Sequence, residues 1–170
     1  LLMMRSYVLS GDTAHYDAVI RALEARGLRV LPAFAGGLDG RPAIDAYFRG
    51  EHGARIDTLL SLTGFSLVGG PAYNDSAAAV DDLTSLDVPY IAAHPLEFQT
   101  LGEWAGAAQG LGPIETTMLI ALPEIDGATD PCVFGGRHGP GGCAGCDRGC
   151  YSDSPDKVMA PCPERVERLA

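Results

Sequence analysis

Two carboxylates, Glu124 and Asp126, stand between a proline and a glycine directly after the apolar run Met118–Leu122. Pro123 fixes a backbone angle and removes an N–H donor, and Gly127 permits a left-handed turn, so both carboxylates are held beside that run. Partial burial and a like-charged neighbour each raise a carboxylate pKa. The pair could act as general base and cation ligand, or form an acidic turn in which Asp126 binds its own backbone amides.

A second polar group, which contains His94, Glu97 and Gln99, follows the apolar run Val88–Ala93. A histidine at the end of a buried strand can exchange protons near neutral pH. The alternative is structural, with His94 capping the strand and Glu97 stabilising the N-terminus of a helix. We therefore predict His94 as a catalytic candidate and Glu97 and Gln99 as candidate substrate-binding residues.

His15, Asn74 and Asp75 follow two other predicted strands. In an open α/β sheet the carboxyl ends of parallel strands lie along one edge, and crevices form where the strand order reverses. We expect these three residues to border that crevice and to bind substrate. For His15 the alternative is a solvated histidine in a first helical turn.

The chain has five cysteines, three of which lie within the glycine-rich stretch 135–150. Cys143, Cys146 and Cys150 are close enough in sequence to surround one metal centre, with Cys162 or Cys132 as a fourth ligand. The spacing indicates an iron–sulfur cluster or zinc. The alternative is a flexible loop with free thiols.

The elements that must position these residues follow a strand–helix–strand pattern that repeats about every 30 residues, as in βαβ units. We predict strands at 3–9, 28–34, within 56–67 and at 88–93, and helices at 15–26, 42–48, 75–86, 101–108 and 113–121. Residues 118–122 could alternatively form a strand. The fold class is α/β, a doubly wound, mostly parallel sheet with helices on both faces and a Gly/Cys-rich irregular C-terminal segment. The expected organisation is an α/β domain at 1–131, a loop insert at 132–162 and the start of a helix at 163–170.

Composition limits the function classes. With 22 acidic and 12 basic residues the net charge is −10, which argues against a nucleic-acid surface. No apolar run reaches the roughly 18 to 20 residues of a transmembrane helix, and we expect a cytoplasmic location. The glycine-rich segment Gly64–Gly70 lacks the lysine of a phosphate-binding loop, so no ATP site is predicted.

Three segments, Leu62–Asp75, Leu86–Thr100 and Ala121–Gly127, closely resemble the large porphyrin-binding H subunits of magnesium chelatases. The bacteriochlorophyll branch is the most similar, partly because of the cysteine-rich insert. The resemblance covers essentially the whole chain. Because H subunits are far longer, the chain resembles one internal domain.

The resemblance implies a role in ATP-dependent insertion of Mg²⁺ into protoporphyrin IX, with ATP bound by AAA+ motor subunits rather than by this chain. Insertion removes two pyrrole protons and strips water from Mg²⁺. Glu124 could take a proton, deliver the ion or do both, His94 or His15 could accept the second proton, and Asp126 would assist. Two alternatives remain: a cobaltochelatase subunit, and a non-catalytic module for porphyrin binding or subunit docking. The isolated fragment is expected to be inactive.

Overall fold

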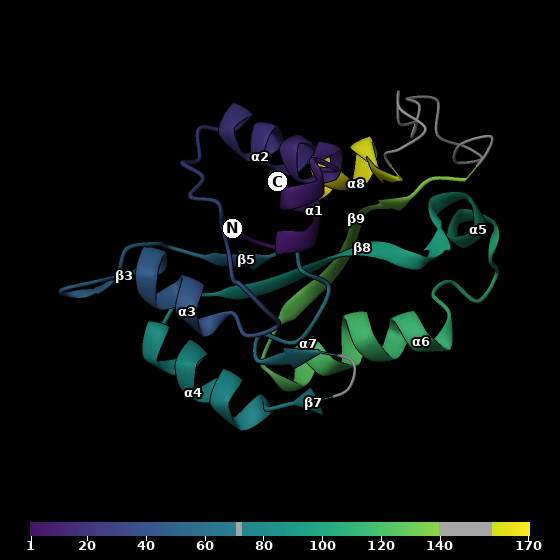
Figure 1. The fold of residues 1–170 in the computed structure, drawn as a ribbon. Helices are drawn as coiled ribbons and strands as arrows, with labels where there is room; N and C mark the ends of the chain where they lie inside the picture. Colours follow the sequence, from purple (N-terminus) through teal and green to yellow (C-terminus); the bar gives the residue numbers. More distant parts are fainter. Residues whose placement is uncertain (71–72, 140–157) are drawn as a thin grey trace. The chain divides into compact units, whose positions relative to one another are not determined.

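The computed structural model describes residues 1–70, 73–139 and 158–170 of an α/β protein (Figure 1). The chain forms two compact units, the first from residues 1–5, 31–93 and 117–131 and the second from 6–30, 94–116 and 132–170. The strand order is β10-β9-β8-β5-β1-β2. In the described residues, no helix has the length and apolar character needed to cross a bilayer.

The first unit contains the parallel strands β2 (Ala33–Phe34), β1 (Leu2–Met3), β5 (Leu59–Ser61) and the start of β8 (Tyr90–Thr100). Leu2 pairs with Ala33 on one side and with Ser61 on the other, and Leu59 pairs with Tyr90. The chain therefore adds β2 on one side of β1 and then β5 and β8 on the other. This confirms the doubly wound order and places its reversal between β1 and β5.

Helices and two hairpins complete the first unit. The side chain of Asp75 begins α4 (Ser76–Leu86) by accepting the Ala78 N–H at 3.0 Å, and Asp87 ends this helix with a φ of +54°. The other helical elements are α3 (Arg41–Ala43), α7 (Leu122–Ile125) and the π-helical segments η1 (Ile44–Phe48) and η2 (Thr116–Ala121). Two antiparallel strand pairs are β3 (Arg49–Gly50) with β4 (Gly53–Ala54) and β6 (Gly69–Gly70) with β7 (Tyr73–Asn74).

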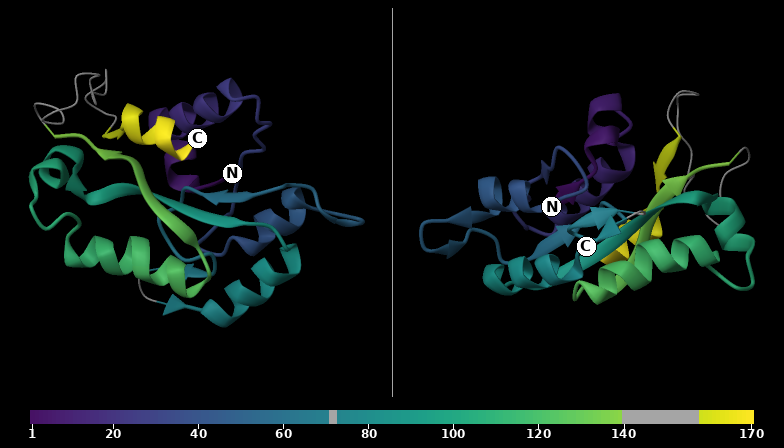
Figure 2. Two further views of the ribbon diagram at one scale, coloured as in Figure 1. Left: turned by 180° about the vertical axis from the view of Figure 1, so that it is seen from behind. Right: turned by 60° about the horizontal axis from the view of Figure 1, so that its bottom comes forward.

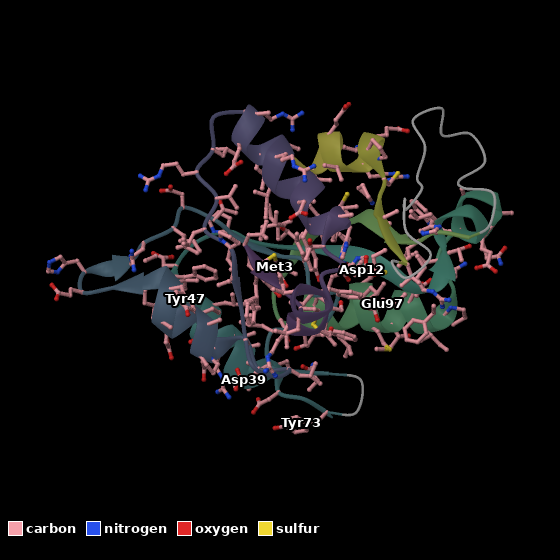
Figure 3. All side chains as sticks on the ribbon, turned by 45° about the horizontal axis from the view of Figure 1, so that its top comes forward. Met3, Asp12, Asp39, Tyr47, Tyr73 and Glu97 are labelled. Carbon is pink, nitrogen blue, oxygen red and sulfur yellow. The ribbon has the colours of Figure 1, made fainter. Side chains whose placement is uncertain are left out.

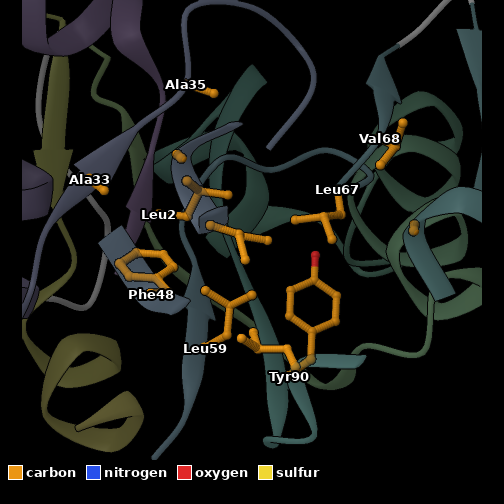
Figure 4. Packing of buried hydrophobic residues seen from close by; sticks show 12 residues of the cluster. Leu2, Ala33, Ala35, Phe48, Leu59, Leu67, Val68 and Tyr90 are labelled. Carbon is orange, nitrogen blue, oxygen red and sulfur yellow. The ribbon is translucent and has the colours of Figure 1, made fainter. Parts of the chain in front are cut away.

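The core of the first unit lies between its strands and helices (Figure 4). Phe48 and Leu59 are fully buried, and Leu2, Leu67 and Tyr90 pack in the same cluster. Burying such side chains stabilises a fold by roughly 1.5 to 3 kcal/mol each relative to leaving them exposed. The cluster holds the strands on both sides of the reversal in place.

The second unit is built around an antiparallel pair, in which β9 (Thr129–Arg137) places Gly135 opposite Pro161 of β10 (Met159–Pro161). Helix α2 (Ala14–Ala25) packs against β10 and against α8 (Pro163–Leu169) (Figure 2). The remaining helices are α1 (Arg5–Ser10), α5 (Leu101–Gly106) and α6 (Pro113–Glu115).

Two predicted strands are much shorter than expected. Within 3–9 the strand ends at Met3 and α1 begins at Arg5, and within 28–34 only Ala33 and Phe34 pair. The apolar character of residues 7–9 does not reflect a buried strand, because Leu9 is 65% exposed. The helices predicted at 15–26, 42–48 and 75–86 are confirmed within one or two residues.

Two other strand predictions affect the site. Strand β8 continues through Thr100, so His94, Glu97 and Gln99 lie within the strand rather than after it. The strand alternative for 118–122 is wrong, because this run is helical. Leu119, Pro123 and Asp126 are all buried, and their spacing of four and three residues puts them on one helical face. Glu124 therefore lies within a helix and Asp126 at its end, and neither follows a strand.

The predicted irregular C-terminal segment is corrected at both of its ends. Strand β9 extends through Arg137, so residues 132–137 are regular structure, and β10 occupies 159–161. The backbone pairing of Gly135 and Gly136 with β10 explains why this glycine-rich start is not a loop. The remainder, 140–157, lies outside the described residues. The expected helix at 163–170 is confirmed as α8.

Candidate functional site

A pocket lies beside the carboxyl ends of β1, β2 and β5, where the strand order of the first unit reverses. Its lining is mainly apolar and includes Met3, Met4, Leu38 and Phe65, and its hydroxyl-bearing residues are Thr63 and Ser66. The empty volume, counted out to open solvent, is about 310 Å³. Most of that volume is open solvent, and the enclosed space of about 20 Å³ holds roughly one water molecule, so the pocket is a shallow apolar depression rather than a ligand-sized cavity.

Asp126 anchors one wall of this pocket. Its side chain is 2% exposed, and its Oδ2 accepts the Leu67 N–H at 2.9 Å and lies 2.5 Å from the Ser66 hydroxyl. Burial raises the pKa of Asp126, and the bonds from Ser66 and Leu67 act in the opposite direction. The predicted acidic turn, in which Asp126 binds its own amides, is therefore wrong: the carboxylate joins α7 to the pocket wall.

Glu124 lies two residues before Asp126, on α7, and is exposed to solvent. Since Asp126 ties the end of this helix to residues 66 and 67, the backbone that carries Glu124 is fixed while its carboxylate stays accessible. An accessible carboxylate on an anchored backbone can exchange protons or contact a cation.

Asn74 and Asp75 have distinct surroundings. Asn74 Oδ1 lies 2.5 Å from Ser66 Oγ and joins the network of Asp126. The Asp75 carboxylate caps α4 and also accepts the Tyr73 hydroxyl at 3.3 Å. Tyr73 itself is 67% exposed and extends away from the β6–β7 hairpin (Figure 3). Of the two predicted residues, Asn74 belongs to the pocket network and Asp75 has a structural role.

The other sequence-predicted residues lie in the second unit. The Tyr7 hydroxyl donates to Glu97 Oε1 at 2.8 Å. Burial and the negative charge of Glu115 raise the pKa of Glu97, and the hydrogen bond from Tyr7 acts in the opposite direction. Gln99 Oε1 accepts the Gly112 N–H at 2.7 Å, so this side chain fixes the start of α6.

Both candidate histidines are fully buried, and neither ring nitrogen of either has a hydrogen-bond partner among the described residues. His15, in α2, lies among aromatic rings, with ring centroids 3.9 Å from Tyr16, 5.1 Å from Tyr7 and 5.9 Å from Phe134. Burial lowers the pKa of His15 to about 3 and that of His94 to about 4. The solvated alternative for His15 is wrong. His15 belongs to the second unit, whereas Asn74 and Asp75 belong to the first. The expected proximity of these residues therefore stays a prediction.

Glu115 is a buried carboxylate that the sequence patterns did not reveal. It is 1% exposed, and its Oε1 accepts the backbone N–H groups of Phe98 and Gln99 at 3.1 and 3.0 Å. A glutamate in the first turn of a helix is usually a solvated charge. The burial of Glu115 becomes apparent only from its contacts with strand β8.

Replacing Glu115 by alanine should destabilise the second unit by about 2 to 3 kcal/mol, because two strand amides lose a charged acceptor. Hydrogen exchange of residues 98 and 99 in the intact subunit would measure the lost protection. Glu164→Ala is the matched control, since Glu164 is an exposed first-turn glutamate of α8. Equal exchange in the two variants would contradict the structural role of Glu115.

The cysteine prediction is only partly within the structure. Cys143, Cys146 and Cys150 lie outside the described residues. Cys162 is buried at the start of α8, and Cys132 is half-buried in β9 with its pKa raised by burial. Across residues 1–70, 73–139 and 158–170, no three His, Cys, Asp or Glu side chains are arranged to hold a metal ion.

A family model and the similar proteins assign this chain to the same family. The CobN/Magnesium Chelatase family model matches residues 1–170. The magnesium-chelatase H subunit of Cereibacter sphaeroides is 68% identical over the whole chain, and that of Rhodobacter capsulatus is 68% identical over 99% of it. The chain spans 14% of the length of each of these relatives.

A solved structure supports the fold. The catalytic subunit of cobaltochelatase from Mycobacterium tuberculosis matches 99% of the chain with a TM-score of 0.68, at 24% sequence identity. The match covers 13% of that protein's length. At this identity the likeness establishes the architecture alone.

Proposed function

Because the chain belongs to the CobN/magnesium chelatase family, we propose that it is part of a cytoplasmic subunit that inserts Mg²⁺ into protoporphyrin IX on the route to bacteriochlorophyll. The observation that carries the proposal is the 68% identity along the whole chain to proteins named as magnesium-chelatase H subunits. ATP would be hydrolysed by AAA+ partner subunits, which agrees with the lack of a phosphate-binding lysine in Gly64–Gly70.

In this proposal an edge of the porphyrin lies against the shallow pocket of the first unit. Its apolar lining suits a planar macrocycle, and Phe65 and Met3 offer the soft contacts that such a ring favours. The small volume means that the rest of the macrocycle would lie outside this pocket.

Insertion releases two pyrrole protons while Mg²⁺ exchanges water for ring nitrogens. Glu124 is the proposed acceptor, because its carboxylate is accessible and its helix is anchored by Asp126. The complete burial of His15 and His94 and their low pKa values weigh against both as the second acceptor. Glu124 would therefore pass each proton to solvent in turn.

The metal distinguishes the proposal from its main alternative, a cobaltochelatase. Reconstitution of the full-length subunit with its motor partners should give ATP-dependent insertion of Mg²⁺ and little insertion of Co²⁺, measured by the absorbance of the metalloporphyrin. Preference for Co²⁺ would favour the cobalt enzyme. Insertion of neither metal, with porphyrin still bound, would favour a non-catalytic binding module.

The cysteine-rich segment also belongs to the proposal. An iron–sulfur cluster or zinc held by Cys143, Cys146, Cys150 and Cys162 would have a structural or sensing role, since metal insertion involves no redox step. Metal analysis of protein prepared without oxygen would test it: a protein with neither iron nor zinc would leave only free thiols.

A further inference from the structure

Tyr73 is an exposed aromatic residue whose ring is held in place. It is 67% exposed in β7, and its hydroxyl donates to Asp75 Oδ2 at 3.3 Å. The other oxygen of that carboxylate, Oδ1, accepts the Ala78 N–H at 3.0 Å and is thereby fixed at the start of α4. Because a tyrosine side chain has few rotatable bonds, a hydrogen bond at its tip restricts the whole ring. Tyr73 therefore presents a ring of defined orientation to solvent.

Leu38 lies on the same face of the β6–β7 hairpin as Tyr73. Gly70 pairs with Tyr73 across the hairpin, and the side chains of directly opposed residues point to one face. A Cβ atom added to Gly70 would collide with the side chain of Leu38, so Leu38 fills the space that a side chain at position 70 would occupy. Leu38 is 47% exposed. Leu38 and Tyr73 are therefore neighbours on an exposed apolar surface, the hairpin platform.

The hairpin platform is continuous with the shallow pocket and connected to the candidate base. Leu38 also lines the pocket. Asn74, which follows Tyr73, has its Oδ1 2.5 Å from Ser66 Oγ, and Ser66 Oγ lies 2.5 Å from Asp126 Oδ2. Glu124 precedes Asp126 by two residues on α7. The hydrogen bonds that anchor α7 therefore also fix the backbone of the platform relative to that of Glu124.

We propose that the ring of Tyr73 stacks on the face of the bound porphyrin and that Leu38 supports the macrocycle between Tyr73 and the pocket. This inference rests on the proposed function. There, only an edge of the macrocycle lies against the pocket, so the rest extends over an adjoining surface, and the platform is an exposed apolar surface that adjoins the pocket through Leu38. A porphyrin is planar and aromatic, and offset stacking on an aromatic ring adds binding energy beyond the burial of area.

The test measures porphyrin affinity in the full-length subunit by absorbance titration with a water-soluble free-base porphyrin. Tyr73→Ala should weaken binding about tenfold, because a stacked aromatic ring is lost. Tyr73→Phe keeps the ring but loses the hydrogen bond to Asp75, so it should weaken binding less than Tyr73→Ala does. Since Tyr73 is exposed, both variants should fold as the wild type does.

Two further variants test the surface itself. Tyr47→Ala is the matched control, because Tyr47 is 51% exposed, belongs to the first unit and lies apart from Tyr73 (Figure 3). It should bind porphyrin as tightly as the wild type. Gly70→Ala should weaken binding, because its methyl group would displace the end of the Leu38 side chain, a movement that requires no shift of the backbone.

The inference is overturned if Tyr73→Ala binds porphyrin as tightly as a wild-type subunit that binds and metallates it, and the proposed function then stands. Equal losses in Tyr73→Ala and Tyr73→Phe, or in Tyr73→Ala and Tyr47→Ala, also contradict stacking by this ring. If Tyr73→Ala keeps its porphyrin affinity but binds the motor subunits more weakly, the platform is a protein-docking surface instead. A wild-type subunit that binds no porphyrin contradicts the proposed function itself.

Discussion

Replacing Glu124 by glutamine in the full-length subunit should slow Mg²⁺ insertion by about 10²- to 10⁴-fold, the usual contribution of a positioned general base. Glutamine has nearly the same shape but cannot accept a pyrrole proton. Because the side chain of Glu124 is exposed and α7 is anchored through Asp126, folding and porphyrin affinity should be unchanged. The rate is measured with the motor subunits and ATP, and porphyrin affinity on the same protein.

Asp130→Asn is the matched control. Asp130 is an exposed carboxylate in β9 with a φ of +49°, a conformation that asparagine also tolerates. Its variant should insert Mg²⁺ at the wild-type rate. Normal insertion by the Glu124 variant would make Glu124 a surface residue and move the search for the base to parts of the subunit outside this chain.

Acidification from pH 7.5 to 5 should destabilise the second unit by up to about 4 kcal/mol, because His15 and His94 are buried and neutral. Their pKa values are lowered to about 3 and about 4, against about 6.5 in an unfolded chain. Below pH 6.5 the unfolded chain binds protons that the folded chain does not, so stability falls as pH falls. At pH 5 each histidine contributes about 2 kcal/mol of this loss. Above pH 6.5 the contribution disappears.

Glu97 acts in the opposite direction. Since its pKa is raised in the folded state, the folded chain binds its proton more readily as the pH falls, which adds stability at acid pH. Glu97 therefore offsets part of the loss expected from the histidines, and variants are needed to isolate their contribution.

Hydrogen exchange of α2 in the intact subunit, corrected for intrinsic rates, would measure this dependence. His15→Phe keeps a flat ring among Tyr7, Tyr16 and Phe134 and should remove about half of it. His52→Gln is the control, because His52 is exposed in the first unit. An unchanged pH dependence in the His15 variant would show that this ring is not the source.

The sequence by itself determined the class of sheet and several helices. Periodic apolar residues in 15–26 predict an amphipathic helix, and turn and cap residues such as Thr13 and Gly27 mark its ends, signals that act within a few residues. The strand–helix alternation also predicted the reversal of strand order and hence where a pocket forms, because βαβ connections follow a fixed handedness. These features depend on short-range chemistry and on general rules of chain topology.

Tertiary structure alone decided the chemical environment of the candidate residues. Asp126 and Glu124 are two residues apart and carry the same functional group, yet Asp126 is buried against Ser66 and Glu124 is exposed. This difference in burial depends on the position of Ser66, which lies 60 residues away in sequence from Asp126. Likewise, the buried state of His15 depends on Phe134, which is distant in sequence. Local pattern does not encode which distant groups desolvate a side chain, and desolvation is what sets its pKa and its hydrogen-bond partners.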